Sequence, residues 1–354
     1  KKISNYFLTI LIIFFGIGLI LFSQSNILAV QSSISLFVSA IFPSLFPFLI
    51  VTELLSHTTI ILLISAKFSK IMPTLFSSPA IGAYPFVMGI ISGYPVGAKI
   101  VANLRESNKI TKIDGDYLLT FTNNAGPLFI IGSVGCGIYL NSSIGFLLYF
   151  IHFVSCIITG FIFGHLLKRN FRDNSITYNS DLNFSSFGEI VSVSIKKAFS
   201  TLSIVCGFVV IFSLIISMIQ TSGILSFIHN SWIFYTLLGI LEITSGIQLI
   251  STISQSSLFL NLVITAFLLG IGGISVLLQV WSVISSTDLS IKTYIFEKYL
   301  MAGFRFFNDY IFTFVSFFSI LHIIFSKTKN TPSFSRYNSI FIVSTKHGAL
   351  HICI

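Results

Sequence analysis

A short stretch of glycine, proline and lysine inside an apolar segment is the part of this chain best suited to bind a solute. It reads GYPVGAK and runs from Gly93 to Lys99. Proline removes a backbone donor and glycine loosens a helix, so the stretch predicts a helix break. Backbone amides exposed at such a break favour negative charge, and Lys99 adds a full positive charge. We therefore predict an anion-binding segment whose contributors are Gly93, Tyr94, Pro95, Gly97 and Lys99.

A pair of asparagines marks a second candidate for the solute site. Asn123 and Asn124 stand just before Gly126 and Pro127, in the sequence TNNAGP, within an apolar segment. Carboxamides in such a segment need hydrogen-bond partners, and the glycine and proline predict a helix break beside them. We predict that both side chains face a solute or an ion.

Glu242 is the third candidate, because it is the only charged residue between positions 198 and 287. A carboxylate there can bind a donor on the solute, coordinate a cation, or titrate and so couple transport to protons. The residues predicted to assist it are nearby hydroxyl groups and a glycine of the following span, namely Thr244, Ser245, Gly273 and Ser275.

Each of these groups also has a purely structural interpretation, which the sequence leaves open. Arg105 follows Lys99 by only six residues, so the lysine can instead extend to the cytoplasmic surface. The asparagines can supply hydrogen bonds between helices. Glu242 can be a protonated carboxyl group bonded to a neighbouring helix, and the glycines near Gly273 can simply permit close packing.

The composition excludes a soluble globular protein. Hydrophobic residues make up 54% of the 354 positions and charged residues only 9%, whereas soluble domains carry about a quarter charged residues. Mean hydropathy is +0.94. The net charge of +9 comes from Lys and Arg beside the apolar windows, which indicates positive loops retained in the cytoplasm and not the binding of nucleic acid.

The apolar windows predict an all-α polytopic membrane protein with about seven transmembrane helices and two re-entrant hairpins. The predicted spans are 6–22, 34–56, 117–140, 144–167, 198–220, 258–284 and 303–325. The predicted hairpins, both interrupted by glycine, proline or polar residues, are 80–104 and 232–254. Basic residues flank 80–104 on both sides, so it enters and leaves at the cytoplasmic face. If 232–254 also re-enters, Lys292 and Lys298 are cytoplasmic; if it spans, they are outside.

The two halves read as an inverted repeat. GIISGYPVG begins at Gly89 and GILEITSG begins at Gly239, at corresponding places in the order of span, broken segment and span. Paired broken segments point to a transporter site near the bilayer midplane. The predicted divisions, in chain order, are an N-terminal helix and loop, a first repeat, a cytoplasmic linker, a second repeat and a basic tail: 1–33, 34–167, 168–197, 198–325 and 326–354.

Motifs for catalysis and for metal binding are missing from the sequence. The seven histidines and four cysteines show no metal-ligand spacing, and no P-loop, nucleophile elbow or dinucleotide fingerprint is present. We expect no enzyme activity, no metal and no cofactor. Glu53 is left outside the site because it stands near the end of a span, and Arg305 with Asp309 because their spacing suits a local ion pair.

Three stretches carry a resemblance to a known family. FPSLFPFLIVTELL from Phe42, GYPVGAK from Gly93 and TNNAGPLFIIGSVG from Thr122 resemble sporulation integral membrane proteins with nucleoside-recognition (Gate) domains. The resemblance covers about residues 35–325. It implies a transporter of a small anionic solute, dipicolinic acid in endospore formation, working by alternating access around the two hairpins. It also implies a location in the mother-cell-derived membrane around the forespore.

The Gate repeats are distantly similar to concentrative nucleoside transporters, in which two hairpins and two broken helices form the solute site. That similarity implies a homo-oligomer or a partnership with other sporulation membrane proteins. Tyr94, Pro95 and Val96 stand where nucleoside transporters place polar groups, which favours an anion facing Lys99. The alternatives are a nucleoside or nucleobase carrier and a non-transporting membrane scaffold of the sporulation machinery.

Overall fold

The computed structural model describes residues 2–166, 187–224, 231–253, 257–296 and 298–299. The predicted span 303–325, the tail 326–354 and most of the linker 168–197 lie outside these residues, as do Arg305 and Asp309. Every regular element within the described ranges is a helix, so the all-α prediction is confirmed for them.

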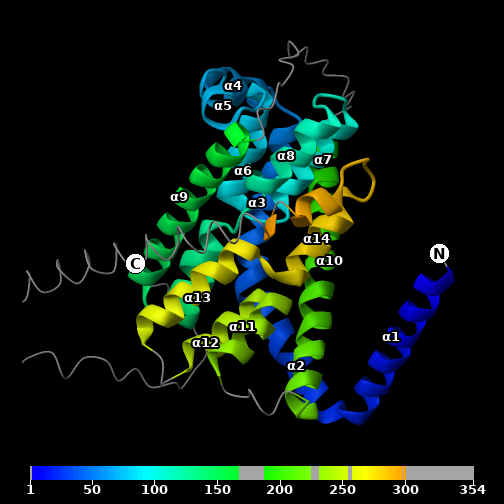
Figure 1. Cartoon of the computed structure of the whole chain (residues 1–354). Helices are drawn as coiled ribbons and strands as arrows, with labels where there is room; N and C mark the ends of the chain where they lie inside the picture. Colours follow the sequence, from blue (N-terminus) through cyan, green and yellow to red (C-terminus); the bar gives the residue numbers. More distant parts are fainter. Residues whose placement is uncertain (1, 167–186, 225–230, 254–256, 297, 300–354) are drawn as a thin grey trace, which may run out of the picture.

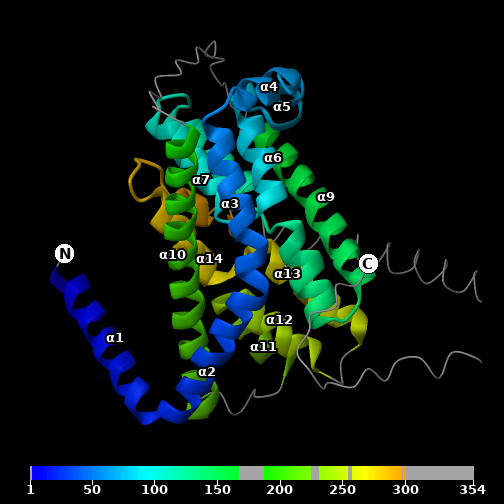
Figure 2. The same ribbon diagram turned by 180° about the vertical axis from the view of Figure 1, so that it is seen from behind.

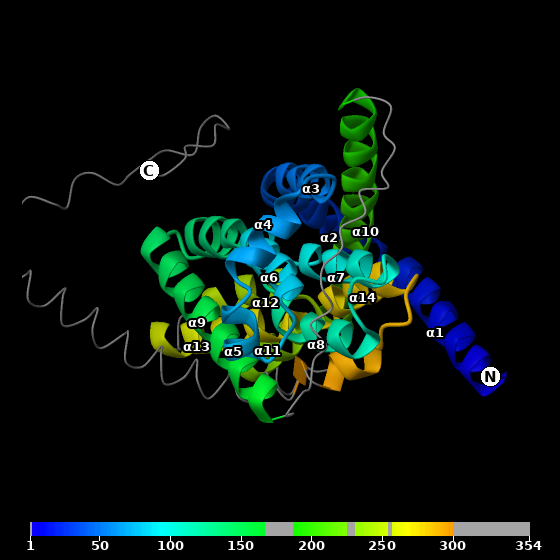
Figure 3. The same ribbon diagram turned by 90° about the horizontal axis from the view of Figure 1, so that it is seen from above.

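The N-terminal segment is a bent pair of apolar helices. Helix α1 (Lys2–Leu21) and helix α2 (Ser23–Leu36) meet at an angle of 97°. The chain then continues through a π-helical segment, η1 (Phe37–Ile41), into α3 (Phe42–Ser56). Figures 2 and 3 show α1 standing apart from the other helices. Its exposed side chains are largely apolar, as expected for a helix that faces lipid.

The first hairpin has two helical arms that meet at a glycine. Two short helices, α4 (Ile60–Lys67) and α5 (Ile71–Phe76), and the turn η2 (Ala80–Gly82) lead into it. Its arms are α6 (Ala83–Ser92) and α7 (Val96–Glu106). Gly93 between them has φ +86°, a conformation that favours glycine. The break therefore lies where the glycine and proline pattern predicts it.

The predicted span 117–140 is two half-helices. Helix α8 (Lys112–Thr122) begins with a capping box between Thr111 and Asp114 and ends at the asparagine pair. The π-helical segment η3 (Leu128–Ile138) begins after Pro127, and α9 (Ser142–Leu166) follows it.

The second half repeats this order. The long helix α10 (Phe187–Ser222) precedes a second broken segment, formed by α11 (Trp232–Leu241) and α12 (Ile243–Ser251). A broken helix follows, formed by α13 (Leu258–Ile271) and α14 (Gly273–Ile284). After a loop, the chain is helical again from residue 291.

The two broken segments lie in opposite halves of the molecule. Figure 1 shows α6, α7 and α8 in the upper half and α11 and α12 in the lower half. The arms pack against each other in both segments, α6 on α7 and α11 on α12. This arrangement is what an inverted repeat with two hairpins requires; the domain boundaries themselves stay predictions.

The apolar lengths support an integral membrane protein. Within the described ranges, α9, α10 and the joined α13–α14 stretch are each long and apolar enough to cross a bilayer, and the bent α1–α2 pair is a fourth candidate. Shorter apolar helices account for several other predicted spans and hairpin arms. The count of seven spans and two hairpins stays a prediction.

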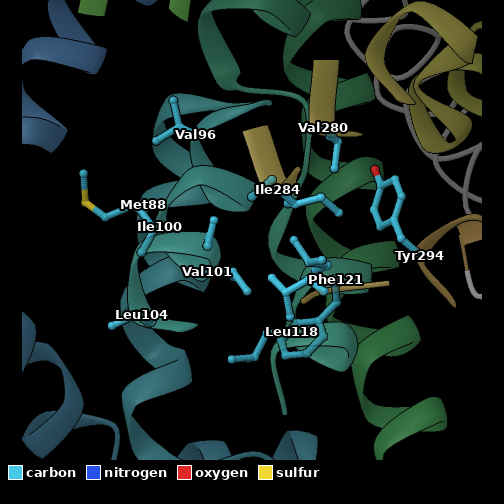
Figure 4. Packing of buried hydrophobic residues seen from close by; sticks show 14 of the residues in the cluster. Met88, Val96, Ile100, Val101, Leu104, Leu118, Phe121, Val280, Ile284 and Tyr294 are labelled. Carbon is cyan, nitrogen blue, oxygen red and sulfur yellow. The ribbon is translucent and has the colours of Figure 1, made fainter. Parts of the chain in front are cut away.

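Part of the largest hydrophobic cluster lies between the first hairpin, α8 and α14. Figure 4 shows Val101, Leu118, Phe121 and Ile284 packed together, and all four are at most 1% exposed. Apolar burial does not drive association between helices in lipid, so close packing through small residues becomes important. A Cβ added to Gly97 would lie 3.2 Å from Asn123 Cα, which shows how closely α7 approaches the end of α8.

Candidate functional site

One pocket lies beside four helix breaks, those between α6 and α7, α8 and η3, α11 and α12, and α13 and α14. Its polar lining comes from Tyr94, Glu242, Thr244, Ser275 and Gln279, with Gly93 and Gly126 exposing backbone. Apolar side chains from η1, α3 and α10 complete the wall. The pocket therefore joins residues from both halves of the chain, and five of the predicted site residues line it: Gly93, Tyr94, Glu242, Thr244 and Ser275.

The pocket is small in this conformation. Its volume is about 50 Å³, which is enough for a few water molecules. An apolar cavity of about 150 Å³ is needed to hold a benzene molecule. An aromatic solute therefore requires the surrounding helices to move apart.

Four helices begin at the pocket. They are α7, η3, α12 and α14, each of which starts at one of the breaks. The first amides of a helix have no partner within the helix, and the N-terminus carries a partial positive charge. Only α12 has a side-chain cap; α7, η3 and α14 have none. The breaks thus surround the pocket with backbone donors.

Glu242 supplies the cap of α12. Its Oε1 atom accepts a hydrogen bond from the Thr244 amide at 3.0 Å, and its Oε2 atom accepts one from the Ser245 amide at 2.7 Å. The side chain is 2% exposed. A carboxylate with two backbone donors at a helix N-terminus is well stabilised, so this charge has a structural role while it also lines the pocket. Thr244 and Ser245 contribute their backbone amides.

Lys99 does not line the pocket, because it is paired elsewhere. Its Nζ atom lies 2.6 Å from Glu53 Oε1 and donates to Thr201 Oγ1 at 3.1 Å. Lys197 Nζ lies 3.4 Å from Glu53 Oε2. These four residues, Glu53, Lys99, Lys197 and Thr201, form what we call the Glu53 cluster. It connects the outer arm of the first hairpin to α3 and α10, and it compensates the charge of Lys99 in this conformation.

Glu53 is a functional candidate that the sequence reasoning missed. It was set aside for its position near a span end, yet it is 3% exposed and holds two lysines. The available signal was its isolation, since no other charge stands between positions 3 and 66. The same argument had singled out Glu242.

The asparagine pair turns away from the pocket and holds the α8 break in place. Asn123 Nδ2 donates to the Tyr294 hydroxyl at 2.9 Å, and its backbone oxygen accepts from Lys298 Nζ at 2.9 Å. Asn124 Nδ2 donates to Phe121 O, and its Oδ1 accepts from the Cys156 thiol. Both side chains therefore make the bonds expected of a structural amide in a membrane protein.

Three other predicted site residues stand close to the pocket without lining it. Pro95 is the residue before α7, and Gly97 lies in its first turn. Gly273 begins α14 with φ +74°. All three lie at helix breaks, and residues close to them in the sequence line the pocket.

Lys298 is the second missed candidate. Charge counting assigned it to a loop together with Lys292, but its side chain is only 4% exposed and reaches the α8 break. Lys292 is exposed. Among the residues that the structure describes, no group of three His, Cys, Asp or Glu side chains is placed to hold a metal ion.

The chain is similar to one curated protein, called "Sporulation integral membrane protein YlbJ", from Bacillus subtilis (strain 168). The two are 29% identical over 331 residues, which cover 85% of this chain and 80% of the relative. No family model matches the chain, and no solved structure matches it. This similarity and the apolar helices together support an integral membrane protein with a relative in sporulation.

Proposed function

We propose that this protein is a membrane transporter of a small anionic solute, and that the solute is dipicolinic acid moved during endospore formation. The observation that carries the proposal is the convergence of four helix N-termini on one pocket. Helix N-termini at broken segments bind anionic groups because their free amides and their dipoles both favour negative charge.

The distribution of caps supports a solute with carboxylate groups. Glu242 already occupies the N-terminus of α12, as one carboxylate bound by two amides. The other three N-termini have no side-chain cap, so they offer donors to carboxylates of the solute. Tyr94 and Phe129, whose ring centroids lie 6.3 Å apart, add aromatic surface for a pyridine ring.

The Glu53 cluster is the contact that we expect to break during alternating access. It ties α7, the outer arm of the first hairpin, to α3 and α10. The pocket beneath is too small for an aromatic dicarboxylate. We propose that Lys99 leaves Glu53 when the hairpin moves, and that its charge then becomes available to the solute on the cytoplasmic side.

Flux into proteoliposomes tests the proposal. Purified wild-type protein should give saturable dipicolinate uptake. Ser275→Leu places a larger side chain in the pocket and should reduce uptake to the protein-free background. Ser282→Leu is the matched control, because Ser282 lies two turns further along α14 with its side chain exposed, and it should transport normally.

Three other outcomes would contradict the proposal in different ways. Absence of flux in folded wild-type protein contradicts the transporter and favours a membrane scaffold. Uptake that nucleosides compete away, with dipicolinate a poor competitor, favours a nucleoside carrier. Equal flux in both serine variants keeps the transporter and contradicts this pocket as its site.

A further inference from the structure

A buried lysine lies at the end of α8, in the middle of the molecule. Lys298 is 4% exposed, and its Nζ atom donates to the backbone oxygen of Asn123 at 2.9 Å. Asn123 is the residue that ends α8. The C-terminus of a helix carries a partial negative charge, so a cation is stabilised there. The ammonium group thus takes the position that a bound monovalent cation would take at a broken helix.

The surroundings of Lys298 are polar and connect it to the pocket. Tyr294, one turn earlier, accepts a hydrogen bond from Asn123 Nδ2, and the Lys298 ammonium lies 5.6 Å from the centre of the Tyr294 ring. Asn123 Oδ1 is buried and has no hydrogen-bond partner among the residues that the structure describes. Tyr94, which lines the pocket, lies within electrostatic range of both Tyr294 and Glu242.

We infer that Lys298 is a proton-coupling site, with the proton as the coupled ion of the transporter; this rests on the proposed function. An ammonium group in a low-dielectric interior is costly unless an acceptor holds it. Asn123 O is that acceptor here, and it sits at a helix break, where movement of the hairpins is transmitted. When the break moves and this hydrogen bond is lost, the ammonium group loses part of its stabilisation and releases its proton more readily.

The coupled step is a simple proton transfer. One N–H bond of the ammonium group breaks, its electron pair stays on Nζ, and the proton passes to water. When the α8 break returns to its first position, Asn123 O is again available as an acceptor, and Lys298 Nζ takes up a proton again. The titratable group seen next to the Lys298 ammonium is Tyr294 on the same helical segment, and Tyr294 in turn lies within electrostatic range of Tyr94 on the pocket wall.

The test is dipicolinate accumulation by the full chain in proteoliposomes. A pH gradient should drive accumulation by the wild type, and a Na⁺ gradient should not. Lys298→Arg keeps the charge but does not titrate. This variant should lose gradient-driven accumulation and retain exchange of labelled for unlabelled dipicolinate. Lys292→Arg, one to two turns earlier and exposed, is the control and should accumulate as the wild type does.

Two results overturn the inference while leaving transport intact: accumulation driven by Na⁺ in the wild type, or accumulation driven by a pH gradient in Lys298→Arg. If the arginine variant does not fold, Lys298→Gln replaces it, and pH-driven accumulation by that neutral variant is equally contradictory. A wild type with no dipicolinate flux under any gradient instead contradicts the proposed function, and the inference falls with it.

Discussion

Glu242 is held by neighbouring amides, but other buried charges of this protein are held by partners far away in the sequence. Glu53 and Lys99 form an ion pair in which the side chains are 3% and 16% exposed. Replacing both members of a buried pair is often tolerated, whereas removing one leaves an uncompensated charge at a cost of about 3–5 kcal/mol. The difference in stability between single and double variants therefore tests whether the two residues are paired.

Neutralising the pair one residue at a time should therefore be worse than neutralising both. We expect Glu53→Gln to lower thermal stability most, because it leaves Lys99 and Lys197 close together without a counter-charge. The double variant Glu53→Gln with Lys99→Gln should be more stable than the sum of the single effects. Thermal melting in detergent measures this, with Lys70→Gln, an exposed lysine, as the control. Additive losses would contradict a coupled pair.

At the scale of elements, the breaks and the glycines beside them determine how closely the helices approach. A Cβ on Gly97 would lie 2.9 Å from the Thr122 carbonyl carbon, and one on Gly246 would clash with the backbone of Gly239. Backbone cannot move aside as a flexible side chain can. Both hairpin arms thus depend on the absence of a side chain at these positions.

Adding one methyl group should distinguish these contacts from ordinary helix positions. Gly97→Ala should destabilise the protein by about 1–3 kcal/mol, the usual range for overpacking, and should reduce transport because α7 shifts away from α8. Gly207→Ala on α10, where nothing lies within 4 Å of the added atom, should be neutral or slightly stabilising. Melting temperatures of the two variants decide the matter, and equal values would contradict the close approach of α7 to α8.

At the scale of the whole molecule, one group of polar contacts joins α7 and α8 to the loop that follows α14, in addition to the Glu53 cluster and the contacts of Asn123. Arg105 of α7 pairs with Asp288 through Nε–Oδ1 at 2.8 Å and Nη2–Oδ2 at 2.9 Å. The amide of Ser290 donates to Asp116, and Ser286 donates to Glu106. Each contact links α7 or α8 to the loop that follows α14, and these contacts hold the first hairpin to the second half at its outer end.

Acid should weaken this link. The Arg105 guanidinium lowers the pKa of Asp288 below its ordinary value of 3.8. A carboxylate whose folded pKa is lowered stabilises the fold above its unfolded pKa and loses that contribution as the pH falls through the folded pKa. Asp288 is exposed and Arg105 is partly exposed, so the effect is small. We expect Asp288→Asn to melt slightly below the wild type at neutral pH and together with it once the pH is below the lowered folded pKa of Asp288; a difference that persists in stronger acid would contradict the pairing.

The inverted arrangement predicts which loops share a membrane face. Single cysteines at Ser107, Ser143 and Thr252, all exposed positions, should be labelled by impermeant maleimides in a background without native cysteines. Ser107→Cys should react only from the cytoplasmic side. Ser143→Cys and Thr252→Cys should react only from the other side, because we predict that both hairpins return to the face from which they enter. Cytoplasmic labelling at Thr252 would mean that 232–254 spans the membrane.

The amino-acid sequence by itself determined the class of the protein and the places where its helices break. Charge depletion requires a membrane environment. Gly93 and Glu242 interrupt their helices through local backbone chemistry, which neighbouring residues decide without help from the rest of the fold. Because the pocket lies beside these breaks, residues at or next to them make up most of its lining.

Only the tertiary structure decided the partners of the long polar side chains. Lys99 could face the solute or the surface by spacing alone, but it meets Glu53, and Lys298 meets Asn123 across 175 positions of sequence. A lysine side chain reaches whatever acceptor the folded chain brings near it, and burial then makes that pairing obligatory. Such contacts depend on how separate helices pack, which local sequence patterns do not encode.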